Sequence, residues 1–438
     1  MRLRTSLVLA AGAILALAVW PLLSAANRTA PTPFGTPAPI FKDYLQRDKT
    51  IALEERLVRA NKRDQIFRRA LASQYLQRFR EQGDFGDIAR AQNMAEQSIA
   101  LQPQLNTGAD MALASAYLNY HNFTAALKAE NVAYGGEGRP VSLAQIASID
   151  MELGRYGEAG RILSKPQKRE DLAWDAVRVR YDELTGHLAE GRALLATLMP
   201  MVDSNLYEPA YDRSWYHMRA AQLAFEAGDD TAAQNEFNES LRVFPDNYMA
   251  LMWEARFYRA HKQWAQTLDA ANRSANLYPL PQVLGYKADA QRALGDVRGA
   301  QETDALIRAE QRLFNVQGVN DRLLANYYDQ RHTYLPDALR AAQDDYKKRG
   351  DEIYADDTMA WTLGALGEWR KAEPFAKRAT QWDTQDSEVQ YHAGIVAMHL
   401  GDWREAKRRL QAALDTNPQF DAFDADDARA QLSHLNAR

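Results

Sequence analysis

Apolar and small residues recur along the chain at an interval of 34 residues. The stretch LGDWREAKRRLQAALDTNP, which ends at Pro418, repeats the pattern of LGEWRKAEPFAKRATQWDT, which ends at Thr384. Both stretches place Leu-Gly, an acid, Trp, a base and Ala at the same offsets. The glycine is predicted to end one helix, because a left-handed conformation costs little without a Cβ atom, and a second helix follows it.

Tracing this 34-residue frame back through the sequence gives ten copies, separated by 32 to 42 residues. Each copy predicts two helices of about a dozen residues. Frame position 20 is Ala in eight copies and position 8 is Ala or Gly in seven, so the two helices can approach closely there. One hairpin cannot bury its apolar face alone, and successive hairpins therefore stack. The copies begin at Ala72, Thr107, Pro140, Leu172, Ser214, Tyr248, Pro281, Val319, Ile353 and Ser387.

Two intervals exceed the period. Residues 198–213 (LMPMVDSNLYEPAYDR) predict a loop or a lengthened helix, and residues 312–318 (RLFNVQG) mark the second addition. Additions of this kind lie on loops at one edge of a solenoid or bend the array. The flanking sequence predicts a helical segment over residues 41–71, the solenoid over residues 72–420, and a short capping helix within residues 421–438.

The first 26 residues have the layout of a secretory signal peptide. Arg2 and Arg4 precede an uncharged stretch, residues 5–26, whose apolar centre is followed by Pro21 and small residues. An anchor in the cytoplasmic membrane is the alternative, because residues 5–26 are long enough to span a bilayer. In both cases we expect the rest of the chain to be exported, as a periplasmic or secreted protein, behind a Pro-rich linker at residues 27–40.

Composition narrows the class of function. Hydrophobic residues make up 46% of the chain and charged residues 25%, which is typical of a globular protein. The net charge of −5 argues against a nucleic-acid partner, which usually requires a basic surface. The absence of cysteine excludes disulfides, thiolate metal sites and cysteine nucleophiles.

Motifs for a catalytic, cofactor or metal site are absent from the sequence. No pair among the eight histidines has the H-x-x-x-H spacing of a helical metal site, and we expect His392 and His399 to be solvated. The four acids within residues 421–427 fit a helix start, since the mid-loop Gly and final Glu of a calcium loop are missing. We therefore expect no catalytic residue, no cofactor and no metal.

The repeat resembles the tetratricopeptide repeat over about residues 72–420. The copies that begin at Leu172 and Val319 match mainly in spacing. The resemblance implies an all-α, right-handed solenoid of about ten stacked helix-turn-helix repeats, with a concave groove that binds peptides or proteins. Residues 351–361 and 391–394 also resemble a set of exported bacterial repeat proteins. The last copy matches best, at Gly394, Gly401, Trp403, Ala406, Ala413 and Pro418.

In that family the groove is lined from positions 2, 5, 9, 12 and 13 of each first helix. The C-terminal half of this chain has aromatic, Met and Arg residues at many of these positions, a composition typical of binding surfaces. A register error of one or two residues would place the same side chains in the core instead. The predicted groove residues are Trp215, Met218, Phe225, Met249, Met252, Arg256, Arg259, Tyr327, Tyr354, Trp361 and Tyr391.

These features predict an exported scaffold that binds protein or peptide partners of the cell envelope through its groove, without catalysis. A structural subunit of a permanent envelope complex is the first alternative, and it would place partner contacts on the ends and convex side as well. An envelope enzyme or a solute-binding protein with a site built across repeats is the second alternative. Membrane contact is expected only through an uncleaved N-terminal segment.

Export can be tested directly. N-terminal sequencing of the protein from an envelope fraction should begin near Asn27, because Arg2, Arg4 and the apolar run favour cleavage after small residues. Recovery of an intact N-terminus in the membrane pellet would show the anchor instead.

Overall fold

A computed structural model describes residues 37–165, 171–317 and 322–437. The predicted signal segment and most of the linker lie outside these residues. Helices make up the regular structure of the described residues, together with one isolated bridge between Phe41 and Pro209. None of the described helices combines the length and the apolar run that a bilayer crossing requires.

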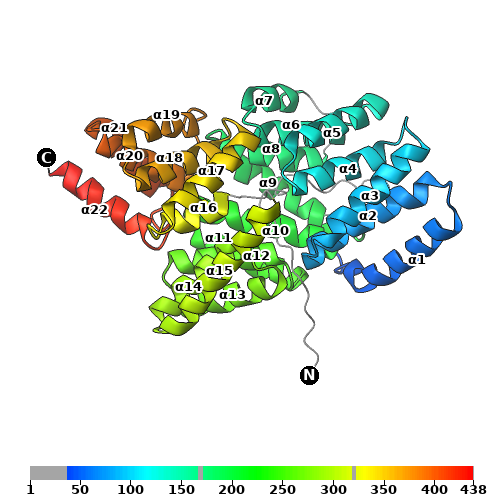
Figure 1. The fold of residues 1–438 in the computed structure, drawn as a ribbon, viewed down its shortest axis with the longest axis horizontal. Helices are drawn as coiled ribbons and strands as arrows, with labels where there is room; N and C mark the ends of the chain where they lie inside the picture. Colours follow the sequence, from blue (N-terminus) through cyan, green and yellow to red (C-terminus); the bar gives the residue numbers. More distant parts are fainter. Residues whose placement is uncertain (1–36, 166–170, 318–321, 438) are drawn as a thin grey trace.

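The described elements follow one another as helices (Figure 1). The first half of the described chain contains a short 3-10 helix (Asp43–Gln46), α1 (Arg47–Ala60), α2 (Gln65–Gln82), α3 (Gly86–Leu101), α4 (Thr107–Asn119), α5 (Phe123–Glu137), α6 (Pro140–Glu152), α7 (Tyr156–Leu163), α8 (Leu172–Leu184), α9 (Leu188–Ser204), α10 (Ala210–Glu226) and α11 (Asp230–Val243). The second half contains α12 (Tyr248–Ala260), α13 (Trp264–Leu277), α14 (Pro281–Ala293), α15 (Val297–Gln317), α16 (Arg322–Asp329), α17 (Leu335–Arg349), α18 (Ile353–Ala365), α19 (Trp369–Ala379), α20 (Ser387–His399), α21 (Trp403–Thr416) and α22 (Asp424–Asn436).

Consecutive helices pair into hairpins, from α2 with α3 to α20 with α21, and each hairpin packs on the next. The prediction of an all-α solenoid is therefore confirmed. The helices α4, α6, α8, α12, α14, α18 and α20 begin at the residues that the 34-residue frame gives. We call the segment between the two helices of one hairpin a turn, and the segment between one hairpin and the next a loop.

The small residues at frame positions 8 and 20 lie where the paired helices meet. Ala360 and Ala372 of one hairpin, and Ala406 of the next, are fully buried. At Gly394 an added Cβ would lie 3.0 Å from the side chain of Leu410 on the partner helix, so even alanine would be tight there. This close packing confirms the predicted reason for the repeated small residues.

The first hairpin and the longer intervals depart from the frame. The helix α2 already begins at Gln65 and ends before Gly83, whose φ is +71°. In the frame that starts at Ala72 the helix-ending glycine would be Gly86, which instead begins α3. The 42-residue interval is accommodated by lengthening α9 and α10, and α15 is lengthened to Gln317. The predicted start of the eighth copy, Val319, lies outside the described residues.

The solenoid winds so tightly that the second half of the chain packs against the first. Contacts recur between residues 192 to 197 positions apart, close to six repeats of the frame. Residues 41–243 therefore form a first coil and residues 244–437 a second coil (Figure 1). The turns of the first coil meet the loops of the second coil, and we call this interface the coil seam.

Backbone meets backbone along the coil seam. A Cβ added to Gly154 would lie 2.5 Å from the carbonyl carbon of Asp351, and one added to Gly186 would lie 2.5 Å from the carbonyl oxygen of Asp383. Leu188 N donates a hydrogen bond to Gln385 Oε1 at 3.1 Å. These distances leave no room for a side chain at the two glycines, which therefore have a packing role in addition to ending a helix.

Buried ion pairs reinforce the coil seam. Arg349 at the end of α17 pairs with Glu152 at the end of α6, and its Nε lies 2.9 Å from Asp345 Oδ1. Glu152 also accepts a hydrogen bond from Arg180 Nη2 at 2.8 Å. Removing one member of a buried pair typically costs about 3–5 kcal/mol, because a charge is left without compensation.

Two glycine substitutions distinguish the cost of close packing at the coil seam from the cost of the left-handed backbone at a helix end. Gly186 and Gly401 have nearly the same φ, +78° and +81°, so alanine is strained at both by about 1–2 kcal/mol. Gly186→Ala should cost about 1–3 kcal/mol more than Gly401→Ala, because overpacking adds to the strain. Urea unfolding followed by circular dichroism measures the difference, and equal losses at the two positions would contradict the seam.

Candidate functional site

The predicted groove side chains lie on first helices of hairpins, as expected, but the closed solenoid covers them. The expectation of an open aromatic groove is therefore corrected by the structure. Their participation in partner binding stays a prediction. Trp215, Met218, Phe225, Met249, Met252, Arg259, Tyr327 and Tyr391 are buried, and Arg256, Tyr354 and Trp361 are partly buried.

Ion pairs between distant first helices show why the groove is closed. Arg256 on α12 lies 3.0 Å from Glu388 on α20, although several hairpins separate the two helices along the chain. Arg259, one turn further along α12, pairs with Asp421 just before α22 and lies 2.8 Å from Asp289. The arginines predicted to orient a partner are thus neutralised by carboxylates of the same chain.

Trp361 is held by its own neighbours. Its ring stacks on His392 at a centroid distance of 4.1 Å, and His392 Nδ1 lies 2.9 Å from Asp357 Oδ2. Burial opposes the charging of His392, but the carboxylate of Asp357 outweighs burial and raises the pKa of the imidazole to about 9. The prediction that His392 is solvated is therefore wrong, because its side chain is buried in this cluster, whereas His399 is exposed.

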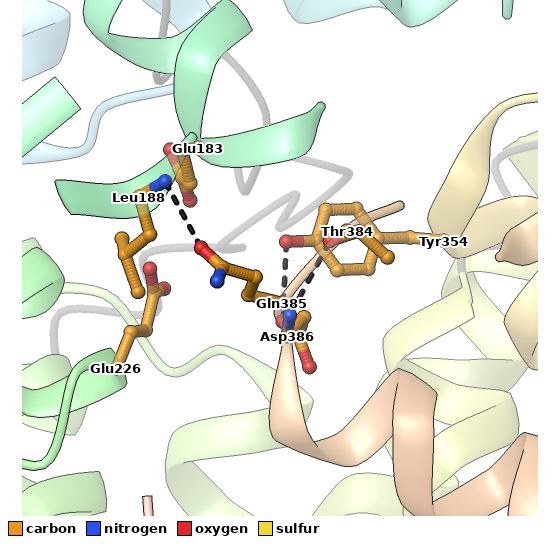
Figure 2. A pocket seen from close by; sticks show the side chains of 7 residues that line it. All are labelled: Glu183, Leu188, Glu226, Tyr354, Thr384, Gln385 and Asp386. Atoms are coloured by element: carbon orange, nitrogen blue, oxygen red, sulfur yellow. Dashed lines mark hydrogen bonds between the residues drawn. The ribbon is translucent and has the colours of Figure 1, made fainter. Parts of the chain in front are cut away.

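A small pocket lies at the coil seam. Figure 2 shows side chains of α8, α9 and α10 facing Tyr354 of α18 and the loop that precedes α20. The empty space is about 230 Å³, part of it open to solvent, which is smaller than the roughly 300–1,000 Å³ of sites for small molecules. The lining residues are Glu183, Leu188, Glu226, Tyr354, Thr384, Gln385 and Asp386.

Three carboxylates gather around this pocket. Glu183 lies 2.5 Å from Arg219 Nη2, and Asp386 accepts a hydrogen bond from the Tyr354 hydroxyl at 3.3 Å (Figure 2). Burial raises the pKa of Glu226, and the carboxylates of Glu183 and Asp386 raise it further. Burial also raises the pKa of Asp386. The cluster is a charged part of the seam, and no group of three metal-ligating side chains was found among the described residues.

A different surface emerges at the outer side of the second coil, where the turns have no further coil against them among the described residues. An added Cβ at Gly295, Gly367 or Gly401 would meet no described atom within 4 Å, in contrast to Gly154 and Gly186. We call the turns from α14–α15 to α20–α21 the turn edge. Its exposed large apolar side chains are Leu294, Val297, Tyr334 and Trp403.

The exposed fraction of the side chain at frame position 17 differs between turns of the two coils. In the first coil this position is buried, with exposures of 2% at Phe123, 0% at Tyr156 and 6% at Leu188. At the turn edge the same position is 58% exposed at Val297 and 46% exposed at Trp403. Two turns of the second coil therefore expose this position, whereas Trp369 and Leu335 at the same position stay partly buried.

The loops on the opposite side of the first coil form what we call the loop edge, and the segment before α1 pairs with one of them, the α9–α10 loop, through the Phe41–Pro209 bridge. Leu101 at the end of α3 is 42% exposed, and Leu105 in the loop that follows is 65% exposed. Leu206 and Tyr207 in the α9–α10 loop are also exposed. Neither edge was predicted from the sequence, because their apolar residues look like core residues until the pitch of the solenoid is known.

The sequence profile of a known family agrees with the repeat in the C-terminal part of the chain. The sequence profile of the tetratricopeptide repeat family matches residues 365–435. Yeast Tom70 is a similar solved structure, with 12% identity over 90% of this chain and 93% of that chain and a TM-score of 0.34. The Cut9–Hcn1 hetero-tetramer of APC/C gives 13% identity, the same coverages and a TM-score of 0.33. No curated protein matches the sequence.

The carboxylate cluster predicts a pH dependence of the coil seam. The folded state holds a proton on Glu226 at pH values where the unfolded chain has released it, since the folded pKa lies above the ordinary 4.5. The contribution of Glu226 to stability is then fully present below about pH 4.5 and is lost as the pH rises through its raised pKa. Glu226→Gln should flatten the fall of melting temperature toward alkaline pH, whereas Glu190→Gln, at an exposed position of α9, should not. Parallel profiles for wild type and Glu226→Gln would contradict the assignment.

Proposed function

The chain is a tetratricopeptide repeat protein, and on this premise we propose that it is an exported assembly scaffold of the cell envelope. It binds protein partners through the exposed edges of its coils, while the groove holds the solenoid closed. The proposal of export rests on the basic and apolar pattern of the first 26 residues.

The exposure of apolar side chains at the edges is the observation that carries this proposal. Leu294 and Val297 are more than half exposed in one turn, and Leu105 is 65% exposed in one loop. Exposed apolar clusters bordered by polar residues are typical of protein interaction sites. The groove arginines, by contrast, already have carboxylate partners, so a peptide would have to displace intramolecular ion pairs to bind there.

This distribution favours a subunit of a permanent complex over a groove-binding scaffold. A permanent subunit contacts its partners through ends and outer surfaces, and the turn edge and loop edge are such surfaces. The pocket at the coil seam offers less room than a typical small-molecule site. A function in binding solutes therefore has less support than a function in assembly.

Capture of crosslinked partners from envelope fractions can show whether partners bind at the turn edge or in the groove. The double variant Leu294→Asp with Val297→Asp places two charges on the turn edge, and we expect it to lose captured partners while its helical content is unchanged. Trp361→Ala should retain partners but melt at a lower temperature, because it removes the stack on His392.

Val132→Asp is the matched control, since Val132 on α5 is 51% exposed and lies outside both edges. It should behave as wild type in capture and melting. A stable Trp361→Ala protein that loses its partners, together with full capture by the turn-edge variant, would return the binding site to the groove.

A further inference from the structure

The coil seam is an interface whose two sides both recur on the outside of the described part of the molecule, as the α14–α15 turn on one side and the α3–α4 loop on the other. Within one chain the turn of a hairpin packs on the loop that lies about one coil later, as Tyr156 and Ile353 show by a hydrogen bond of 3.2 Å. Phe225 O accepts a second such bond from Asn417 Nδ2 at 2.6 Å. The turn edge presents further turns of this kind, and the loop edge presents further loops.

The apolar residues of the two edges correspond in place to residues that the seam buries. Val297 has the frame position of Tyr156, which the second coil covers completely. Gly295 has a φ of +85°, close to that of Gly186, and space for a Cβ, so the α14–α15 turn has the backbone form of a seam turn without the covering loop. The turn edge therefore continues an established interface.

From these observations we propose that the occupant of the turn edge is the loop edge of a second copy of this chain. The copies then stack head to tail, and the second copy prolongs the solenoid of the first. This inference rests on the proposed assembly function and names the partner at the same surface. Contacts between unlike surfaces of identical subunits leave one free surface at each end, so they propagate into chains of subunits unless a ring closes.

The register of the two edges supports a continuous stack. The helix α22 is a first helix and α1 a second helix, so α1 of another copy can take the place beside α22. Within one chain a turn meets the loop that lies about 197 residues later. Starting at the α14–α15 turn, this distance runs past the end of α22 and continues at α1 of the second copy. It ends at the α3–α4 loop of that copy. Leu294 and Val297 then face Leu101 and Leu105, which are the exposed apolar residues of that loop.

Sedimentation velocity of the full chain, in the form that the cell processes, tests the proposal over a range of protein concentrations. Wild type should form species larger than a dimer as concentration rises. The turn-edge variant (Leu294→Asp with Val297→Asp) and a loop-edge variant (Leu101→Asp with Leu105→Asp) should each associate at least tenfold more weakly. Leu105 has a φ of +55°, a region that Asp tolerates better than Leu, so the second variant should fold.

Mixing the two variants gives the sharpest outcome. Each retains one intact edge, so an equimolar mixture should form dimers through a single interface and nothing larger. Val132→Asp should assemble as wild type does. A monomeric wild type at all concentrations, or a mixture that does not dimerise, would overturn the proposal. If a monomeric wild type still captures another envelope protein through the turn edge, the proposed assembly function survives and self-stacking fails.

Discussion

The contact between glycine turns of the first coil and backbone loops of the second coil determines the shape of this molecule. At Gly154 and Gly186 the backbone segments on the two sides of the coil seam lie so close together that no side chain would fit. A solenoid of this repeat could in principle wind with a wide pitch and an open groove. Because the turns are docked on the next coil, the pitch is fixed by the thickness of one layer of hairpins.

Closure of the coils explains why the charged side chains inside the solenoid are paired and the aromatic side chains are buried. Once α12 and α20 face each other, Arg256 and Arg259 must be compensated in a poorly solvated space, and Glu388 and Asp421 provide the carboxylates. Buried pairs of this kind contribute little net stability but penalise alternative arrangements strongly. We infer that these pairs specify how the coils register, while the exposed apolar side chains lie at the turn edge and the loop edge.

The sequence predicted the hairpins far better than the way they wind. Ala360, Ala372 and Ala406 recur with the period of the repeat, because every hairpin needs the same close approach, and the period reveals it. Gly186 and Gly401 are indistinguishable in sequence, yet only the first is covered, since coverage depends on contacts nearly 200 residues apart. The expected openness of the groove is corrected for the same reason: Trp215 and Phe225 lie on the predicted helices but are buried by the winding of the coils.

Closure of the two coils upon each other in solution is the central claim. Because the chain has no cysteine, two introduced cysteines can carry a single pair of spin labels. We choose positions Arg155 and Asp351, which are both exposed and lie on opposite sides of the coil seam beside Gly154. Pulsed electron resonance should give one narrow distribution at a short distance, set mainly by the length of the labels. A broad distribution at long distances would show that the solenoid is open and would contradict the closed coil seam.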